Sequence, residues 1–411
     1  MKRNRRSIFF IIAAIALWHS TAFCYSNIAA AFPFGLPLGP ASGTMVNMGQ
    51  TGVGILNDHN VMLANPANLG AINKTAFSSL LSIDLLRIQE ESRNTDHIAV
   101  APRQLAFAFP LGIIGTIGFA LAKETIVRTS YQTPAASIEG SDFIGRISYS
   151  TKGGLTGWRI GWGYAIGKWA YIGAAYERLY FELNNTKIVD LASFNAITTR
   201  DSTHAHFSGN ALYGGLMVPI AKATIGVAGR YIFEDDISYS RAQYRRTDST
   251  TAIAGTAILR DANIKLPPYF AFGASYEFSP RWLVGADLGF EKWGSYSAHG
   301  LLPASDMEYA LRFGTGARLI PAPDLLAPKY WETIHYRLGF KFWQLPRDGT
   351  SEFAFSLGTG FPVKGGGLLD LIATFGRRTD ERFTDYSEDF VQIGIGINGG
   401  RKWTKVSPGN Y

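Results

Sequence analysis

Large apolar residues alternate with small or charged residues over long runs of this chain, and no other feature restricts its fold as much. Around residue 160, Trp158, Ile160 and Trp162 alternate with Arg159 and Gly161. A period of two places successive side chains on opposite faces of a β-strand. The sequence therefore predicts an all-β fold whose strands have one large apolar face and one small or polar face. The alternation recurs in the runs 268–278, 282–291, 308–319, 334–342 and 391–398.

The length of these runs favours a membrane barrel over a soluble β-sandwich. Strands of soluble proteins have about five or six residues, whereas these runs reach nine or more, the length that a tilted strand needs to cross a bilayer. Aromatic residues such as Trp282 and Trp293 also lie near the run ends, where a barrel places its interfacial girdles. A soluble sandwich also alternates, and it stays open as the alternative.

The links between the runs fall into a short and a long group, as in outer-membrane barrels with short periplasmic turns and longer extracellular loops. Pairing the runs across these links predicts an antiparallel barrel of about fourteen strands. A further strand-like run at 143–150 is interpreted as a loop or as a strand extension, and the boundaries within 143–154 stay open. The predicted short links are 110–115, 166–169, 219–223, 279–282, 321–333 and 361–367, and the long ones are 90–100, 128–154, 184–204, 235–264, 294–307, 346–350 and 379–389.

The N-terminus has the pattern of a secretory signal peptide. Basic residues within the first six positions precede an apolar run at 8–18 and then small residues, which predicts a signal at 1–31 with cleavage after Ala22 or Ala31. The run is too short to span a membrane as a helix. Cys24 is the only cysteine, so no intramolecular disulfide forms. Acylation of Cys24 is the minor alternative, because Phe23 is bulky for the position before a lipid-modified cysteine.

A glycine-rich segment at 43–69 precedes the first predicted strand. It contains Asn57 and Asp58 and then the motif Asn65, Pro66 and Ala67. Its glycines permit close backbone approach, and its Asn and Asp side chains bond neighbouring backbone groups. The segment resembles the N-terminal hatch of the FadL-type family of long-chain fatty-acid transporters in the outer membrane. The resemblance implies a hatch at 32–74 inside a barrel at 75–403, with a tail at 404–411.

The FadL-type resemblance implies transport of hydrophobic small molecules, such as long-chain fatty acids or aromatic hydrocarbons, across the outer membrane of a Gram-negative-type bacterium. The ligand is captured among the extracellular loops, the hatch shifts, and the ligand leaves through a gap in the wall. We expect the hatch to contact Arg159, Arg312 or Arg337 in the lumen, and Gly118 is the candidate for a wall kink. The expected partners are the hydrophobic ligand and outer-membrane lipid, and a monomer is favoured.

The alternative function is a non-transporting barrel that serves as a docking or shuttle component of protein secretion, as in other relatives of this fold. Apolar residues in the loops, such as Ile188 and Val189, favour transport. The net charge of +7 comes from dispersed Lys and Arg residues, which does not favour nucleic-acid binding. His204 and His206 lack a third ligand nearby, and no nucleophile motif is present. We therefore expect no enzyme, no metal and no cofactor.

Overall fold

The computed structural model describes most of the predicted barrel and hatch. The predicted signal peptide (1–31) and tail (404–411) lie outside the described residues, and so does Asp58. The described residues are 35–39, 42–57, 60–62, 64–90, 93–132, 136–137, 144–192, 198–247, 250–253, 258–263, 266–296, 307–323, 325–363, 366–382 and 386–401.

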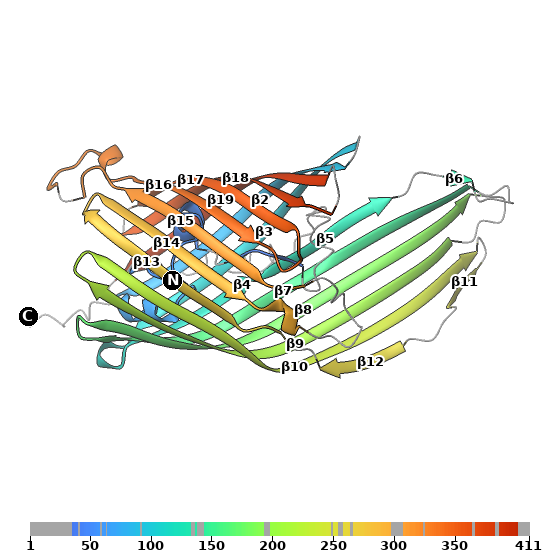
Figure 1. The fold of residues 1–411 in the computed structure, drawn as a ribbon, viewed down its shortest axis with the longest axis horizontal. Coiled ribbons are helices and arrows are strands. Elements are labelled where there is room, and N and C mark those ends of the chain that lie inside the picture. Colours follow the sequence, from blue (N-terminus) through green and yellow to red (C-terminus); the bar gives the residue numbers. More distant parts are fainter. Residues whose placement is uncertain are drawn as a thin grey trace, which may run out of the picture.

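Fourteen antiparallel strands form a closed barrel (Figure 1), which confirms the fold class predicted from the alternating runs. In chain order the wall strands are β2 (Thr75–Glu90), β3 (Arg93–Pro110), β4 (Thr116–Lys123) continued by β5 (Thr125–Gln132), β7 (Ile144–Ile166), β8 (Ala170–Ala192), β9 (Thr198–Ile220), β10 (Ala223–Thr247), β13 (Tyr269–Ser279), β14 (Trp282–Glu291), β15 (Ala310–Leu319), β16 (His335–Gln344), β17 (Thr350–Val363), β18 (Gly367–Asp380) and β19 (Tyr386–Arg401). Strand β19 pairs with β2 along its whole length and closes the ring.

The two faces of the wall match the two faces of the alternating runs. Ile160, Leu338 and Phe355 are exposed on the outside, whereas Arg159 and Glu177 are buried inside. An apolar outer face and a polar inner face are the arrangement of a barrel that stands in lipid. Three 3-10 turns lie in links between neighbouring strands, namely η3 (Gly112–Ile114), η4 (Trp293–Ser295) and η5 (Tyr330–Glu332). Among the described residues no helix is long and apolar enough to cross a membrane.

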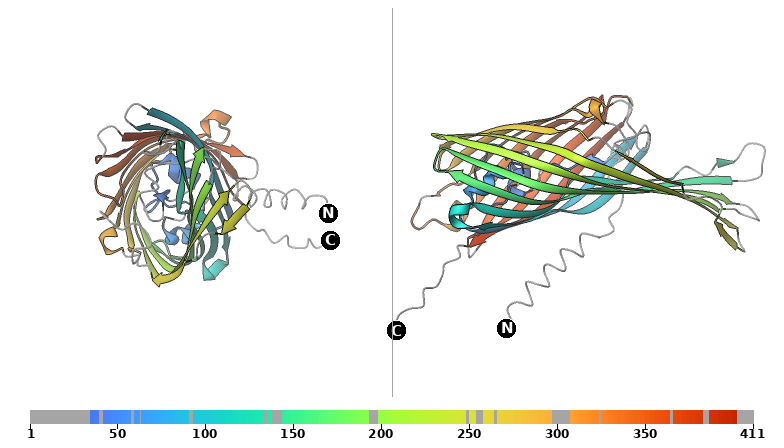
Figure 2. Two further views of the ribbon diagram at one scale, coloured as in Figure 1. Left: turned by 90° about the vertical axis from the view of Figure 1, so that its right-hand side faces the viewer. Right: turned by 90° about the horizontal axis from the view of Figure 1, so that it is seen from below.

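Four wall strands are much longer than a bilayer crossing requires. Strands β7, β8 and β9 have 23 residues each and β10 has 25, whereas about 9–11 tilted residues cross the hydrocarbon. Their distal halves project beyond the long-link end of the barrel as a sheet, together with β6 (Ala136–Ser137), β11 (Thr250–Ile253) and β12 (Ile258–Asn263) (Figures 1 and 2). We call this part the extension. Its described side chains at 145–152 and 184–190 are half-buried or exposed, and none is buried.

The extension corrects three of the predicted loops. The segments 128–154, 184–204 and 235–264 lie largely in strands β5 to β12. Their sequences lack a continuous apolar face, so hydrophobic alternation does not mark them as strands. Their backbones nevertheless continue the ladders of the barrel, as in the pairing of β7 with β8 from Ile166 and Ala170 out to Ile144 and Ala192. The run at 143–150 is a strand extension, one of its two interpretations.

The N-terminal part of the described chain lies inside the barrel, where Figure 2 shows it in blue. Residues 35–74, called the inner segment below, contain β1 (Leu36–Pro37), α2 (Gly43–Asn47) and η2 (Pro66–Ala71). Helix α2 contacts β16 to β19, whereas η2 contacts β4 and β7 to β9. Met45 and Ala67, one from each of these helices, are fully buried. The inner segment therefore crosses the lumen from one side of the wall to the other.

The third wall strand is interrupted at Glu124, between β4 and β5. Val127 is four positions after Lys123, but their partners on β7, Gly153 and Thr156, are only three positions apart. The extra residue makes a β-bulge, which bends the strand. Strand β4 pairs with β3, whereas β5 pairs on that side with β1 of the inner segment. The two halves of this strand therefore have different neighbours.

Closure of the barrel by β2 and β19 is testable through its register. Leu81 lies directly opposite Ile395, so we expect the double variant Leu81→Cys with Ile395→Cys to form a disulfide. The cross-linked barrel then keeps a compact mobility after boiling on a non-reducing gel. The control pair, Leu81→Cys with Val391→Cys, is displaced by four residues in register and should not cross-link. Equal cross-linking of both pairs contradicts the closure register.

Candidate functional site: the filled lumen

Wall glycines make room for the backbone of the inner segment. A Cβ atom built on Gly226 would overlap the carbonyl oxygen of Val53, and one on Gly273 would lie 2.5 Å from the amide nitrogen of Gly54. A Cβ on Gly339 would overlap the amide nitrogen of Gly49. At these positions glycine has no Cβ, so the backbone of the inner segment can approach the wall backbone closely. The small-residue face of the alternating runs thus leaves room for the backbone of this segment.

Polar wall side chains bond the backbone groups of the inner segment. A carboxylate oxygen of Asp287 accepts hydrogen bonds from the amides of Gly52 (2.6 Å) and Val53 (2.8 Å). The Gln104 amide donates to the carbonyl oxygen of Val61 at 3.0 Å. Buried backbone groups need such partners. Two wall hydroxyl groups make further bonds, from Ser275 to Gly54 O and from Thr116 to Ile72 O.

Asn65 of the predicted hatch motif holds the centre of the inner segment. Its side-chain oxygen accepts a hydrogen bond from the Ala67 amide (3.0 Å) and caps η2, with Pro66 in the first turn. Its amide group donates to Val53 O at 2.9 Å and lies within reach of Val227 O in the wall. The Asn68 side chain accepts a hydrogen bond from the Asn57 amide and donates one to the Asn57 carbonyl oxygen. Asn65 therefore joins the inner segment to itself and to the barrel.

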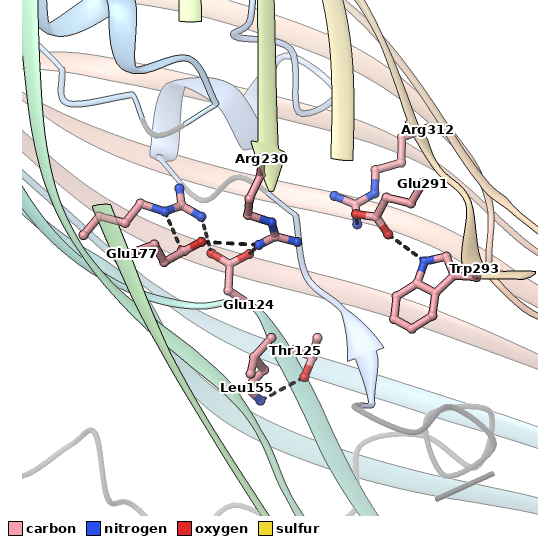
Figure 3. Close-up of polar contacts among 9 residues, drawn as sticks. Glu124, Thr125, Leu155, Glu177, Arg230, Glu291, Trp293 and Arg312 are labelled. Atoms are coloured by element: carbon pink, nitrogen blue, oxygen red, sulfur yellow. Dashed lines mark hydrogen bonds and ion pairs between the residues drawn. The ribbon is translucent and has the colours of Figure 1, made fainter. Parts of the chain in front are cut away.

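Four charged side chains meet in the lumen beside β1 and form what we call the charge cluster (Figure 3). Arg159 donates to Glu177 at 2.5 Å and to Glu124 at 2.8 Å. Arg230 lies 3.5 Å from each of the same two carboxylates. The Arg159 guanidinium also stacks over the Tyr213 ring, 4.8 Å from its centroid. Two positive and two negative charges balance one another where burial leaves little water to solvate them.

Further ion pairs line the rest of the lumen wall. Arg312 donates to Glu291 at 3.1 Å, and the other carboxylate oxygen of Glu291 accepts from the Trp293 indole at 2.7 Å (Figure 3). Arg337 pairs with Asp370 at 2.6 Å. These pairs come from neighbouring or nearby strands, so they bind the wall to itself and occupy space in the lumen.

The three arginines expected to contact the hatch pair with wall carboxylates. Arg159 pairs with Glu177 and Glu124, Arg312 with Glu291, and Arg337 with Asp370. The wall residues that bond the inner segment include Asp287, Gln104, Ser275 and Thr116. The sequence interpretation missed these residues, although Asp287 stands on the inner parity of its run beside Gly285 and Gly289, and this parity is the signal that identifies it.

Gly118 lies in the regular part of β4, where it pairs with Ala108 and Gly161. A Cβ atom there would lie 2.7 Å from Cδ2 of Leu69 in the inner segment. The interruption of this strand is six residues further on, at Glu124. Gly118 therefore makes room for Leu69, and the bend of the wall is at Glu124.

Three small cavities lie between the described residues of the inner segment and the wall. The cavity beside the charge cluster has a volume of about 30 Å³, the one between Leu69 and Phe119 about 30 Å³, and the one beside Pro37 and Thr125 about 40 Å³. Sites for drug-sized ligands have about 300–1,000 Å³. Larger hollows of about 520 and 620 Å³ open on the outer face, beside exposed residues such as Leu338 and Phe375. In the described part of the chain, no group of three or more His, Cys, Asp or Glu residues is placed to hold a metal.

The close contact between wall glycines and the inner segment is testable with two adjacent residues of β9. A Cβ on Gly215 would overlap the Asn65 side chain, whereas a Cβ on Gly214 meets nothing within 4 Å. We expect Gly215→Ala to displace the inner segment and to lower the thermal unfolding midpoint of the purified barrel. Gly214→Ala should leave the midpoint unchanged or raise it slightly, since alanine restricts the unfolded chain. Equal midpoints for both variants would argue against close contact at Asn65.

The charge cluster is testable at Glu177, which is fully buried. Glu177→Leu leaves Arg159 with one carboxylate partner fewer, and breaking a buried pair costs about 3–5 kcal/mol. We expect a large drop in the unfolding midpoint. Glu182→Leu on the same strand, where the side chain is exposed, is the matched control and should change the midpoint little. A similar small effect of both variants contradicts a tightly paired cluster.

Solved structures with this fold are hydrophobic-compound channels and their homologues. A FadL homologue of Pseudomonas aeruginosa matches with a TM-score of 0.63 and 12% identity, covering 91% of this chain and 100% of that one. The toluene transporter TodX of Pseudomonas putida gives 0.60 and 14%, covering 90% and 99%. CymD, a monoaromatic hydrocarbon channel, gives 0.58 and 14%, covering 89% and 98%. At these identities the likeness shows a shared fold, of a kind found in Gram-negative outer membranes.

The sequence itself matches a different family. No curated protein matches the chain. The family model called BamG matches residues 6–406 and so covers nearly the whole sequence. The FadL-type resemblance therefore holds at the level of the fold, and the chain belongs to the BamG family.

Proposed function

We propose that this chain is a closed outer-membrane barrel that serves as a docking component of protein secretion, with the inner segment as its permanent plug. The observation that carries the proposal is the filled lumen. The interior cavities of about 30–40 Å³ are roughly tenfold smaller than typical sites for small molecules. The proposal assigns no catalytic step and no cofactor to the chain.

The lining of the lumen also disfavours passage of an apolar molecule. The cavity beside the charge cluster is bordered by Glu124, Arg159, Arg230, Glu291 and Arg312. A hydrocarbon moving past these groups would remove their remaining hydration and give no hydrogen bond in return, which is unfavourable. The charges therefore suit a fixed interior better than a hydrophobic path.

The extension supports a docking role. It is a sheet outside the barrel, and its described side chains at 145–152 and 184–190 include none that is buried. An isolated sheet with no core adds little stability of its own. Among these described residues, both faces of the sheet have exposed side chains that a partner can contact. Membership of a family other than the FadL-type family favours the same function.

Transport of hydrophobic molecules is the second candidate, and the fold likeness to CymD and TodX favours it. In this case the inner segment moves as a hatch and opens a path from the loops to the wall. The cavity beside Leu69, Phe119 and Met62 is mostly apolar and would form part of that path. The ligand class would be long-chain fatty acids or aromatic hydrocarbons.

Conductance and uptake distinguish the two functions. We expect the wild-type barrel to show no ion conductance in a planar bilayer. A variant that lacks residues 43–69 should conduct ions, because the deletion removes most of the inner segment. Cells with and without the wild-type protein should take up radiolabelled oleate and toluene at equal rates. Faster uptake of either compound in cells that carry the protein, with glucose uptake unchanged, would establish transport and overturn the docking proposal.

A further inference from the structure

The outer half of β3 has an edge without a ladder partner among the described residues. On one side β3 pairs with β2 along almost its whole length. On the other side it pairs with β4, but only from Gln104 to Pro110. The next strand segment, β5, pairs with β1 in place of β3. The edge from Ile98 to Arg103 therefore faces a gap in the wall.

This edge lies at the level of the hydrocarbon layer. Ile98, Val100 and Pro102 share the outward parity of β3, and Ile98 is 53% exposed, while Ala99 and Ala101 are buried. The apolar outer face continues down the strand to Phe109, which is also exposed. The segment is part of the lipid-facing belt.

A row of charges marks the upper limit of the belt. Arg87 and Asp96 form a two-point ion pair across β2 and β3, with nitrogen–oxygen distances of 2.7 and 3.1 Å. Arg377 and Asp389 form the same pair across β18 and β19 at 2.6 and 2.8 Å. Asp389 lies opposite Arg87, so the four residues form one cross-strand row. Ile98 lies just below this row, inside the apolar zone.

Pro102 indicates which backbone groups face the gap. Proline has no N–H for a ladder, so within sheets it stands at edges or at bulges. Pro102 pairs with Leu81 of β2 beside a β-bulge whose extra residue is Arg103, and because it has no N–H to give to β2, its nitrogen faces the gap. Since strand groups alternate in direction, the N–H and C=O groups of Val100 and Ile98 face the same way.

We propose that this edge of β3 binds an extended strand of a second outer-membrane polypeptide, which adds to the sheet at Ile98 to Arg103. The inference rests on the proposed docking function and names the surface and the kind of partner. Lipid tails cannot bond backbone groups, and open sheet edges are not tolerated in hydrocarbon. A strand satisfies them by β-augmentation. Its residues alternate, with apolar side chains toward the lipid beside Ile98 and Val100.

A second copy of this chain does not fit the edge. Strands of outer-membrane barrels tilt about 35–45° from the membrane normal. Two copies related by a two-fold axis along the normal, the usual symmetry of a dimer, would present β3 strands that cross at about 70–90°. Crossed strands form no ladder, and the same tilt excludes a wall strand of any other barrel. The added strand is therefore an extended segment outside a barrel wall.

The inference is testable by site-specific cross-linking in intact cells. A photo-crosslinking phenylalanine analogue replaces Ile98 or, in a separate variant, Pro102. The control position is Phe355 on β17, which is 56% exposed but pairs with strands on both sides. We expect Ile98 and Pro102 to cross-link to one segment of one polypeptide, with the attachment point moving by about four residues between them, as strand pairing requires. Phe355 should not cross-link to that segment.

A second variant tests the backbone. Val100→Pro removes an edge N–H without touching the ladder to β2, whereas Val100→Thr keeps the N–H and the branched side chain. We expect Val100→Pro to lower the Ile98 cross-link about tenfold or more, because proline blocks strand addition, and Val100→Thr to leave it unchanged. The heat-modifiable gel shift of the folded barrel is measured for both variants.

Three results overturn the edge inference: adducts of lipid or of this chain alone, the same peptide from Phe355, or a cross-link that Val100→Pro leaves unchanged in a folded barrel. If a polypeptide copurifies with the wild-type barrel but does not cross-link at Ile98, the edge inference fails and the docking function stands. If no polypeptide copurifies with the wild-type barrel, the docking function fails as well.

Discussion

Within a membrane every backbone N–H and C=O group must find a partner inside the protein, and this requirement accounts for most of the structure. It makes the chain a closed ring, in which β19 returns to β2 in continuous register. It also explains the polar anchors of the inner segment, because an irregular backbone survives at membrane depth only where protein surrounds it. Asp287 and Asn65 supply bonds that a ladder supplies elsewhere. In the outer half of β3, the backbone groups on one side have no ladder partner among the described residues.

The interruption at Glu124 connects the wall to the lumen. Its amide donates to Leu155 O and its carbonyl accepts from the Leu38 amide, so its backbone joins β7 to the inner segment. Its carboxylate pairs with Arg159 and Arg230. The residue that ends the β3–β4 ladder is thus also a member of the charge cluster. A break in the wall is stabilised by ion pairs inside the barrel, and the two features depend on each other.

Much of the barrel is predictable from sequence because lipid imposes one strict pattern on the wall. The run around Trp162 and the run ending at Ile397 both show it, and pairing segments across the short and long links gives the correct number of strands. The described side chains of the extension are half-buried or exposed, so residues such as Thr186 and Lys187 show no alternation, and the sequence pattern indicates a loop there. The lumen partners of Arg312 and Arg337 were not predictable, because parity places a side chain inside the barrel but does not give the height or the neighbour across the strand. The glycines of the inner parity, such as Gly226 and Gly273, are the sequence signal that the lumen is filled.

The filled lumen and the open edge of β3 favour the same kind of function. Moving the inner segment far enough to open a path would break the bonds of Asn65 to Val53 and of Asp287 to Gly52, and would also draw Leu38 away from Arg103. Each loss leaves a polar group without a partner in a place with little water. Adding a strand at β3 breaks none of these bonds and supplies partners to groups that lack a ladder. The energetics of this barrel therefore favour binding at its wall over passage through its centre.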